Sequence, residues 1–493
     1  MPTRESLRDP GRDAVSAPPH RPGLILAFLC VAGFMTFLDV SIVNVALPTI
    51  EDELGFSQTT LTYVVTTYGM LLGGFLLLTG RLADTFGRRR MLRTGLVLFA
   101  LASLGAGLAQ NAAMLIGARA AQGLGAAFIA TAALSLLTGN FAEGAARNKA
   151  LGAWGALSGI AAVAGVTLGG LLTDGPGWRW VFFINVPIGL LGALVAPLVV
   201  AESRSPERRA SFDVAGAVLL TAGLVLLIFS LGLTVDDSGV PLGRVYGGFA
   251  LSALLLIGFV LVERRAGAPL VPLEVFGRRS LRAANVVAVL LLGTCVTLFF
   301  FASLFLQQVL GYSPLRTGLA YVPLAVIVAV GAGVASQLVT KVAAKPVLMA
   351  GLALTAAGMF LLWRAPSDAA YATGLLPAFL VSGLGLGLSF VPVQVSAFAG
   401  TDEDESGLSA GLINTAQEVG GALGLAVAAT YAFRRVAELT AWADGAPARV
   451  ISARTEVFHD AFLAGACFAT AGLVLTLILL PMSKSPASES TSA

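Results

Sequence analysis

Long apolar runs recur along almost the whole of this 493-residue chain. Runs of about 18–25 residues are long enough to cross a bilayer, and backbone groups in lipid must bond within their own segment, so each run is expected to be a helix. We expect about fourteen spans, near residues 24–47, 58–79, 91–109, 112–138, 149–172, 181–200, 212–233, 245–262, 283–306, 316–340, 347–364, 371–396, 408–432 and 459–482. The fold class predicted is an all-α polytopic membrane protein.

The positions of lysine and arginine predict how these spans are threaded. When the spans alternate in direction, most basic residues fall on one side, which by the positive-inside rule is the cytoplasmic side and holds both termini. Two charged, proline-containing segments bracket the runs 212–233 and 245–262, which we expect to be a lipid-facing pair joining two six-helix bundles. The predicted parts are a cytoplasmic tail (1–22), a first bundle (23–201), the inserted pair with its linker (202–264), a second bundle (265–482) and a second cytoplasmic tail (483–493).

Composition excludes several functions. Only 12% of the residues are charged, about half the ~25% typical of soluble domains. A net charge of +3 is too small to indicate a nucleic-acid partner, and the three cysteines have no metal-ligand spacing. No Ser/His/Asp set and no nucleotide-binding loop of the G-x-x-x-x-G-K-[ST] type is evident, so we expect neither an enzyme nor an ATP-driven pump. No metal and no cofactor is expected.

Two opposite charges lie deep within the predicted spans of the first bundle. Asp39 lies in the first span and Arg119 in the fourth, and each is about 12 Å from the outer end at 1.5 Å per residue. Charged groups at such depth are costly and are by default functional or paired. Because these spans run antiparallel, we predict that Asp39 and Arg119 pair, either as part of proton coupling or as a static ion pair that orders the bundle.

Glu418 lies near the middle of the thirteenth span, and the second bundle offers it no evident basic partner. A low-dielectric environment disfavours an unpaired charge, which suits a carboxyl group that loads and releases a proton near neutral pH. Asn414 and Gln417 flank it and are candidates for contact with a substrate. The alternative is a protonated acid that serves only as a hydrogen-bond partner between helices.

The loop Gly80-Arg-Leu-Ala-Asp-Thr-Phe-Gly-Arg-Arg-Arg-Met91 carries a long, specific spacing of glycines, one acid and arginines. It resembles the signature loop of the major facilitator superfamily. Arg119-Ala-Ala-Gln-Gly-Leu-Gly125 resembles that superfamily's R-x-x-Q-G pattern, and Leu38–Pro48 resembles the first-helix signature of its fourteen-span drug:proton antiporter family. The stretch Gly152–Gly170 resembles the antiporter motif.

The resemblance implies a major facilitator fold and gives candidate roles to particular residues. The antiporter motif falls on Gly165, Gly169 and Gly170, although Val166 stands where the pattern has proline, so we expect a straighter helix. The signature loop implies a conformational latch at Gly80, Asp84, Gly87, Arg88 and Arg89, which we predict meets the acidic run Asp402–Glu405 or the helix that follows it. The candidates for lining a substrate cavity are Tyr63, Thr67, Tyr68, Asn44, Gln122, Phe301, Gln308, Asn414 and Gln417.

The function expected from the resemblance is efflux of small lipophilic or cationic drugs, driven by a proton gradient, by a monomer in the bacterial inner membrane. The expected partners are the lipid bilayer and a small-molecule substrate. A dedicated exporter of one self-made metabolite, such as an antibiotic, a siderophore or an amino acid, is an alternative. A transport-dead sensor or scaffold that keeps the fold is another.

Overall fold

The computed structural model describes residues 21–55, 58–203, 213–234, 241–266, 269–366, 370–401, 405–434 and 447–481, which are almost entirely helical. The α-helices are α1 (Pro22–Leu54), α2 (Gln58–Phe86), α3 (Arg88–Gly107), α4 (Ala112–Asn140), α5 (Ala145–Asp174), α6 (Trp180–Phe183), α7 (Asn185–Val199), α8 (Val214–Leu233), α9 (Leu242–Glu263), α10 (Arg279–Gln308), α11 (Pro314–Lys341), α12 (Ala344–Trp363), α13 (Leu376–Ala397), α14 (Ser406–Arg434) and α16 (Pro447–Leu479). A short 3-10 segment, η2 (Leu273–Gly277), precedes α10, and a π-helical turn, η3 (Tyr371–Leu375), precedes α13.

Polar side chains begin several of these helices by binding backbone N–H groups that have no partner within the helix. The carboxamide oxygen of Asn111 accepts a hydrogen bond from the N–H of Met114, at 2.9 Å, at the start of α4. The carboxylate of Asp213 accepts one from the N–H of Gly216, at 2.8 Å, at the start of α8. These caps set the helix boundaries and leave the apolar interiors to pack.

The length and hydropathy of the helices confirm the all-α membrane fold. Among the described residues, twelve helical segments are long and apolar enough to cross a membrane, with α6 and α7 together forming one of them. Two further helices, α5 and α14, are 30 and 29 residues long. The helix α14 carries Asn414, Gln417 and Glu418 in its middle, and these polar groups lower its hydropathy.

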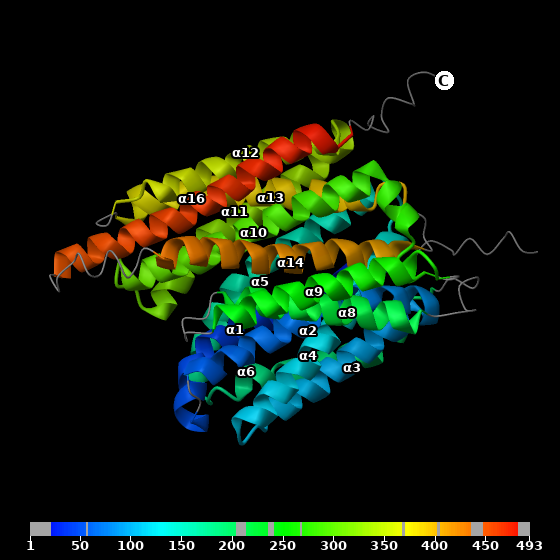
Figure 1. The fold of residues 1–493 in the computed structure, drawn as a ribbon, viewed down its shortest axis with the longest axis horizontal. Coiled ribbons are helices and arrows are strands. Elements are labelled where there is room, and N and C mark those ends of the chain that lie inside the picture. Colours follow the sequence, from blue (N-terminus) through cyan, green and yellow to red (C-terminus); the bar gives the residue numbers. More distant parts are fainter. Residues whose placement is uncertain are drawn as a thin grey trace, which may run out of the picture.

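The helices form two bundles with an inserted pair beside them. Helices α1–α7 pack mainly with one another, as do α10–α14 with α16. Figure 1 shows the blue and cyan helices of the first bundle on one side and the yellow to red helices of the second on the other. The bundles meet where α2 packs on α14 and where α5 packs on α11, contacts that we call the α2–α14 seam and the α5–α11 seam.

The two inserted helices differ in how they are buried. The outer one, α9, exposes large apolar side chains such as Leu254, Ile257 and Leu261, as a lipid-facing helix should. The inner one, α8, packs against both α2 and α14. The expectation that the whole pair faces lipid is therefore wrong for α8, which covers one edge of the α2–α14 seam.

Candidate functional site

Asp39 and Arg119 form an ion pair in the interior of the first bundle. The pair joins α1 to α4, and the side chains are 0% and 1% exposed. The second carboxylate oxygen of Asp39 accepts hydrogen bonds from the amides of Gln122, at 3.1 Å, and Asn185, at 2.9 Å. The contact predicted from equal depth in antiparallel spans is present, and its role in transport stays a prediction.

Arg119 is held as fully as its partner. Its Nε donates to the carbonyl of Val64 at 2.8 Å, and its guanidinium lies 4.3 Å from the centre of the Tyr68 ring. The Tyr68 hydroxyl in turn donates to the carbonyl of Thr36 at 3.2 Å. Together these contacts tie α1, α2, α4 and α7 into one polar network, in which each charge is compensated.

Asn185 is the member of this network that sequence reasoning missed. It begins α7 and is fully buried. An asparagine inside the apolar run 181–200 was the available signal, since a buried amide needs hydrogen-bond partners just as a buried charge does.

Glu418 stands in a different environment, at the α2–α14 seam. Its side chain is half-buried and its Cβ faces Gly73 of α2, because a methyl group placed on that glycine would lie 3.2 Å from it. Ile228 of α8 contacts the same glycine. Among the described residues we find no hydrogen-bond or ion-pair partner for Glu418, and the buried Nδ2 of Asn414, one turn away, also has none.

The predicted cavity residues divide into three groups. Tyr63, Thr67, Asn414 and Gln417 are half-buried and lie on α2 and α14, the two helices that form one seam. Asn44, in the second half of α1, and Gln308, the last residue of α10, are exposed. The other three are packed inside the bundles: Phe301, Gln122 and Tyr68.

The expectation that these three line a cavity is wrong for this conformation. Phe301 is fully buried against Phe458 of α16, with ring centres 6.5 Å apart. Gln122 is fully buried, and its amide is compensated because it donates both to Asp39 and, at 2.8 Å, to the hydroxyl of Ser103. Sequence alone did not separate the buried face of each helix from the face at the seam.

The signature loop meets the second bundle through its acid. The two carboxylate oxygens of Asp84, at the end of α2, accept hydrogen bonds from the N–H groups of Gly407 and Leu408, each at 3.0 Å, in the first turn of α14. Arg88 pairs with Asp84 at 3.2 Å, and both side chains are almost completely buried. Gly80 lets the two backbones touch, since a Cβ there would lie 2.4 Å from the Gly407 carbonyl oxygen.

The neighbouring arginines contact their own bundle. Arg89 and Arg90 lie 3.6 and 3.8 Å from the carboxylate of Glu202, just after α7. Gly87 adopts a positive φ of 109°, and a side chain there would collide with the same carboxylate. The predicted contact with the end of α14 is therefore made by Asp84, while Arg89 holds the loop against α7.

Only one residue of the predicted acidic run lies within the described residues. Glu405 pairs with Arg278, just before α10, at 2.6 Å. Residues 402–404 lie outside the described residues, so the predicted contact between them and the loop stays a prediction. We call the end of the molecule that holds Gly80–Met91 and Glu405 the loop end.

The glycines of the antiporter motif set the distance between α1 and α5. A Cβ on Gly165 would lie 2.3 Å from the Cβ of Ser41, and one on Gly169 would lie 3.0 Å from the carbonyl oxygen of Ile42. Gly170 has open space beside it. The helix α5 is unbroken over its 30 residues, and Val166, where the pattern has proline, faces Gly318 of α11.

Two helical bundles meet along two seams, with a compensated ion pair inside one bundle and, at a seam, an acid that has no partner among the described residues; this arrangement is that of a polytopic membrane transporter. This chain belongs to the major facilitator superfamily, whose family model matches residues 29–425.

Similar proteins support this assignment. The chain is 37% identical over 469 residues to the puromycin resistance protein of Streptomyces alboniger, covering 94% of this chain and 92% of that one. It is 38% identical over 464 residues to the cephamycin export protein of Amycolatopsis lactamdurans, covering 93% of each. The solved structure of the human organic anion transporter MFSD10 superimposes with a TM-score of 0.66 at 15% identity, covering 93% of this chain and 100% of that one, which shows the shared fold.

Proposed function

We propose that this protein exports small lipophilic or cationic antibiotics across the bacterial cytoplasmic membrane, driven by entry of protons. Both termini are cytoplasmic in this proposal, and the loop end faces the cytoplasm. The substrate leaves chemically unchanged, so the protein acts as a carrier and not as an enzyme. It works as a monomer, and its driving force is the proton gradient, with no cofactor. Support comes from relatives that are named for resistance to or export of antibiotics.

The proposal of proton coupling rests on the position of Glu418. It is a half-buried acid in the middle of a long helix, at the contact between the two bundles, with no partner among the described residues. A carboxyl group at this position can gain or lose a proton without breaking a contact to a described residue. Movement of the bundles changes its access to water. Protonation and the opening of the seam are thereby linked.

The test is transport by everted membrane vesicles or proteoliposomes under an imposed pH gradient. Accumulation of a labelled drug should require the gradient, collapse when a protonophore is added, and reverse direction when the gradient is reversed. Transport that is unchanged without any proton gradient overturns the coupling. A chain that binds drugs without moving them would instead be a sensor or scaffold.

A dedicated exporter of one self-made metabolite is favoured by a specific observation. Several relatives carry the name of a single antibiotic: puromycin, cephamycin, lincomycin or tetracenomycin C. A panel of chemically unrelated antibiotics, each assayed in the same vesicles, separates the two. Broad export predicts transport of many of them with similar efficiency, whereas dedicated export predicts one compound or one scaffold.

A further inference from the structure

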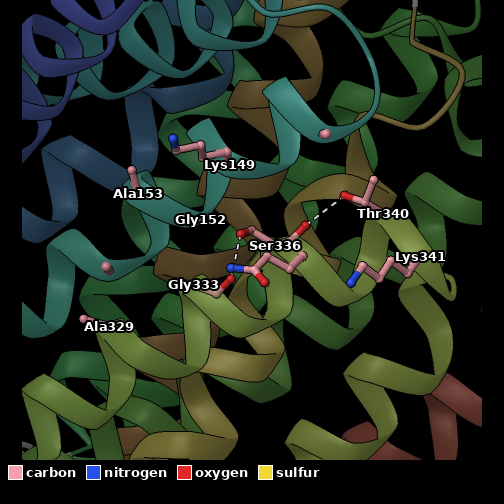
Figure 2. A pocket seen from close by; sticks show the side chains of 11 residues that line it. Lys149, Gly152, Ala153, Ala329, Gly333, Ser336, Thr340 and Lys341 are labelled. Atoms are coloured by element: carbon pink, nitrogen blue, oxygen red, sulfur yellow. Dashed lines mark hydrogen bonds between the residues drawn. The ribbon is translucent and has the colours of Figure 1, made fainter.

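A groove lies at the loop end of the α5–α11 seam, between the first turns of α5 and the last turns of α11. It has a volume of about 550 Å³ and is formed by one face of each helix. Figure 2 shows Lys149 on the α5 wall and Lys341 on the α11 wall, with Gly152 and Ser336 between them. The residues that line it are Ala145, Lys149, Gly152, Ala153, Ala156, Ala329, Gly333, Ser336, Gln337, Thr340 and Lys341.

The polar end of the groove carries positive charge. Lys149 lies near the start of α5 and Lys341 is the last residue of α11, so both ammonium groups belong to the loop end. No acid occurs among the lining residues. The amide of Asn148 donates to the hydroxyl of Thr340 at 3.0 Å and joins the two helices at this level. The groove therefore attracts an anion.

The rest of the groove is small and apolar, and its flank faces the lipid. Ala153, Ala156 and Ala329 line the part toward the middle of the membrane. Exposed apolar side chains follow this part on both helices, Ile160 on α5 and Val326 on α11, and belong to an apolar surface suited to hydrocarbon. An occupant thus needs an anionic group at one end and an apolar chain at the other.

We propose that this groove binds an anionic phospholipid of the cytoplasmic leaflet. Its phosphate lies between Lys149 and Lys341, at headgroup depth, and one acyl chain lies along the alanines. Basic pockets between membrane helices on this side suit such headgroups. The depth assignment rests on the proposed topology, but binding itself does not depend on it.

The position of the groove gives the lipid a consequence. It lies across a contact between the two bundles, where a Cβ on Gly152 would meet the Cβ of Ser336 at 3.0 Å. A lipid held by both helices stabilises the arrangement in which their loop ends are together, because separating the bundles would separate the two lysines. Anionic lipid content would then shift the balance between conformations.

Native mass spectrometry of the purified full chain, with phosphatidylglycerol or phosphatidylcholine added, tests the proposal. We expect wild-type protein to retain phosphatidylglycerol in preference to phosphatidylcholine. The K149Q/K341Q double variant should bind phosphatidylglycerol up to about 25-fold more weakly, since each lysine near a membrane contributes about a fivefold gain. The matched control is Lys345→Gln, because that exposed lysine lies outside the groove and donates to the Leu477 carbonyl.

A second variant tests the apolar part. Gly333 has open space around the position of a Cβ and lies within α11, so Gly333→Leu should fold and fill the groove. It should weaken phosphatidylglycerol binding while both lysines remain. Soluble glycerol phosphate competing as well as the whole lipid would identify a free phosphate as the ligand and overturn the lipid assignment. Equal binding by wild type, the double variant and Gly333→Leu would overturn the site.

Discussion

Asp39 and Glu418 are both acids within long apolar helices, yet they differ in burial and in hydrogen-bond partners. Asp39 is completely buried and bonded to Arg119, Gln122 and Asn185. Glu418 is half-buried, lies at the contact between the bundles, and has no partner among the described residues. One charge is fixed by its surroundings, and the other is free to change.

This contrast leads us to infer different roles for the two acids in the proposed cycle. Protonating Asp39 would leave Arg119 without its counter-charge inside the first bundle, a penalty typical of broken buried pairs. Protonating Glu418 breaks no hydrogen bond or ion pair to any residue that the structure describes. We therefore assign the first bundle's pair to structure or to sensing of substrate, and the proton itself to Glu418.

The largest effect is expected from Asp39→Asn. The variant keeps the shape of the side chain but leaves Arg119 buried without compensation, which should lower stability by about 3–5 kcal/mol. Denaturation of the purified protein, followed by circular dichroism, measures the loss. Transport should fall with the amount of folded protein.

The double variant D39N/R119Q is the control for this charge effect. Removing both charges should recover part of the stability lost by Asp39→Asn alone, since coupled neighbours are not additive. If Asp39→Asn folds and transports like wild type, the ion pair is dispensable and Asp39 is no more fixed by its surroundings than Glu418.

Glu418→Gln should leave the fold intact and stop proton coupling. The amide is nearly isosteric, and no hydrogen bond or ion pair is broken among the described residues, so stability should change by less than about 1 kcal/mol. Accumulation driven by a pH gradient should disappear, while binding and exchange of drug across the membrane persist. Gln417→Glu offers a matched test, because it moves the acid by one position on the same helix and should not restore coupling when combined with Glu418→Gln.

Asp84→Asn is expected to have an intermediate effect at the loop end. Its carboxylate binds two N–H groups in the first turn of α14, where negative charge is favoured by up to about 2 kcal/mol in a buried setting. Loss of that charge should increase the population with the loop ends apart, by up to about thirtyfold. Accessibility of single cysteines placed at the loop end to a soluble maleimide measures this balance. Glu143→Gln, which removes an exposed acid paired within its own helix, should leave it unchanged.

Much of this architecture was accessible from sequence because its causes are local. Apolar run length predicts membrane helices, and the depth of Asp39 and Arg119 in antiparallel spans predicts their contact. The sequence does not predict which way each side chain points around its helix. The side chains of Phe301 and Gln122 point into the bundles, where they are fully buried. The same limit hid Asn185 as a partner of Asp39, and the packing of α8 over the seam, since both depend on contacts between distant helices.

The smallest effect concerns Glu53, an exposed counterpart of Asp39 in the same helix but beyond its membrane-spanning part. Hydrogen bonds from Arg179, and then from the Trp178 indole at 2.6 Å, lower the pKa of Glu53 below its ordinary 4.5. Because the folded pKa is the lower one, the stabilisation is present above the unfolded value and is lost as the pH falls through the folded value. Its size is under about 1 kcal/mol, since the pair is solvent-exposed and screened. Thermal melts should therefore show wild type losing slightly more stability than Glu53→Gln between pH 6 and pH 3. Asp52→Asn is the control and should lose as much stability as wild type. Parallel pH profiles for wild type and Glu53→Gln would show that this contact adds nothing.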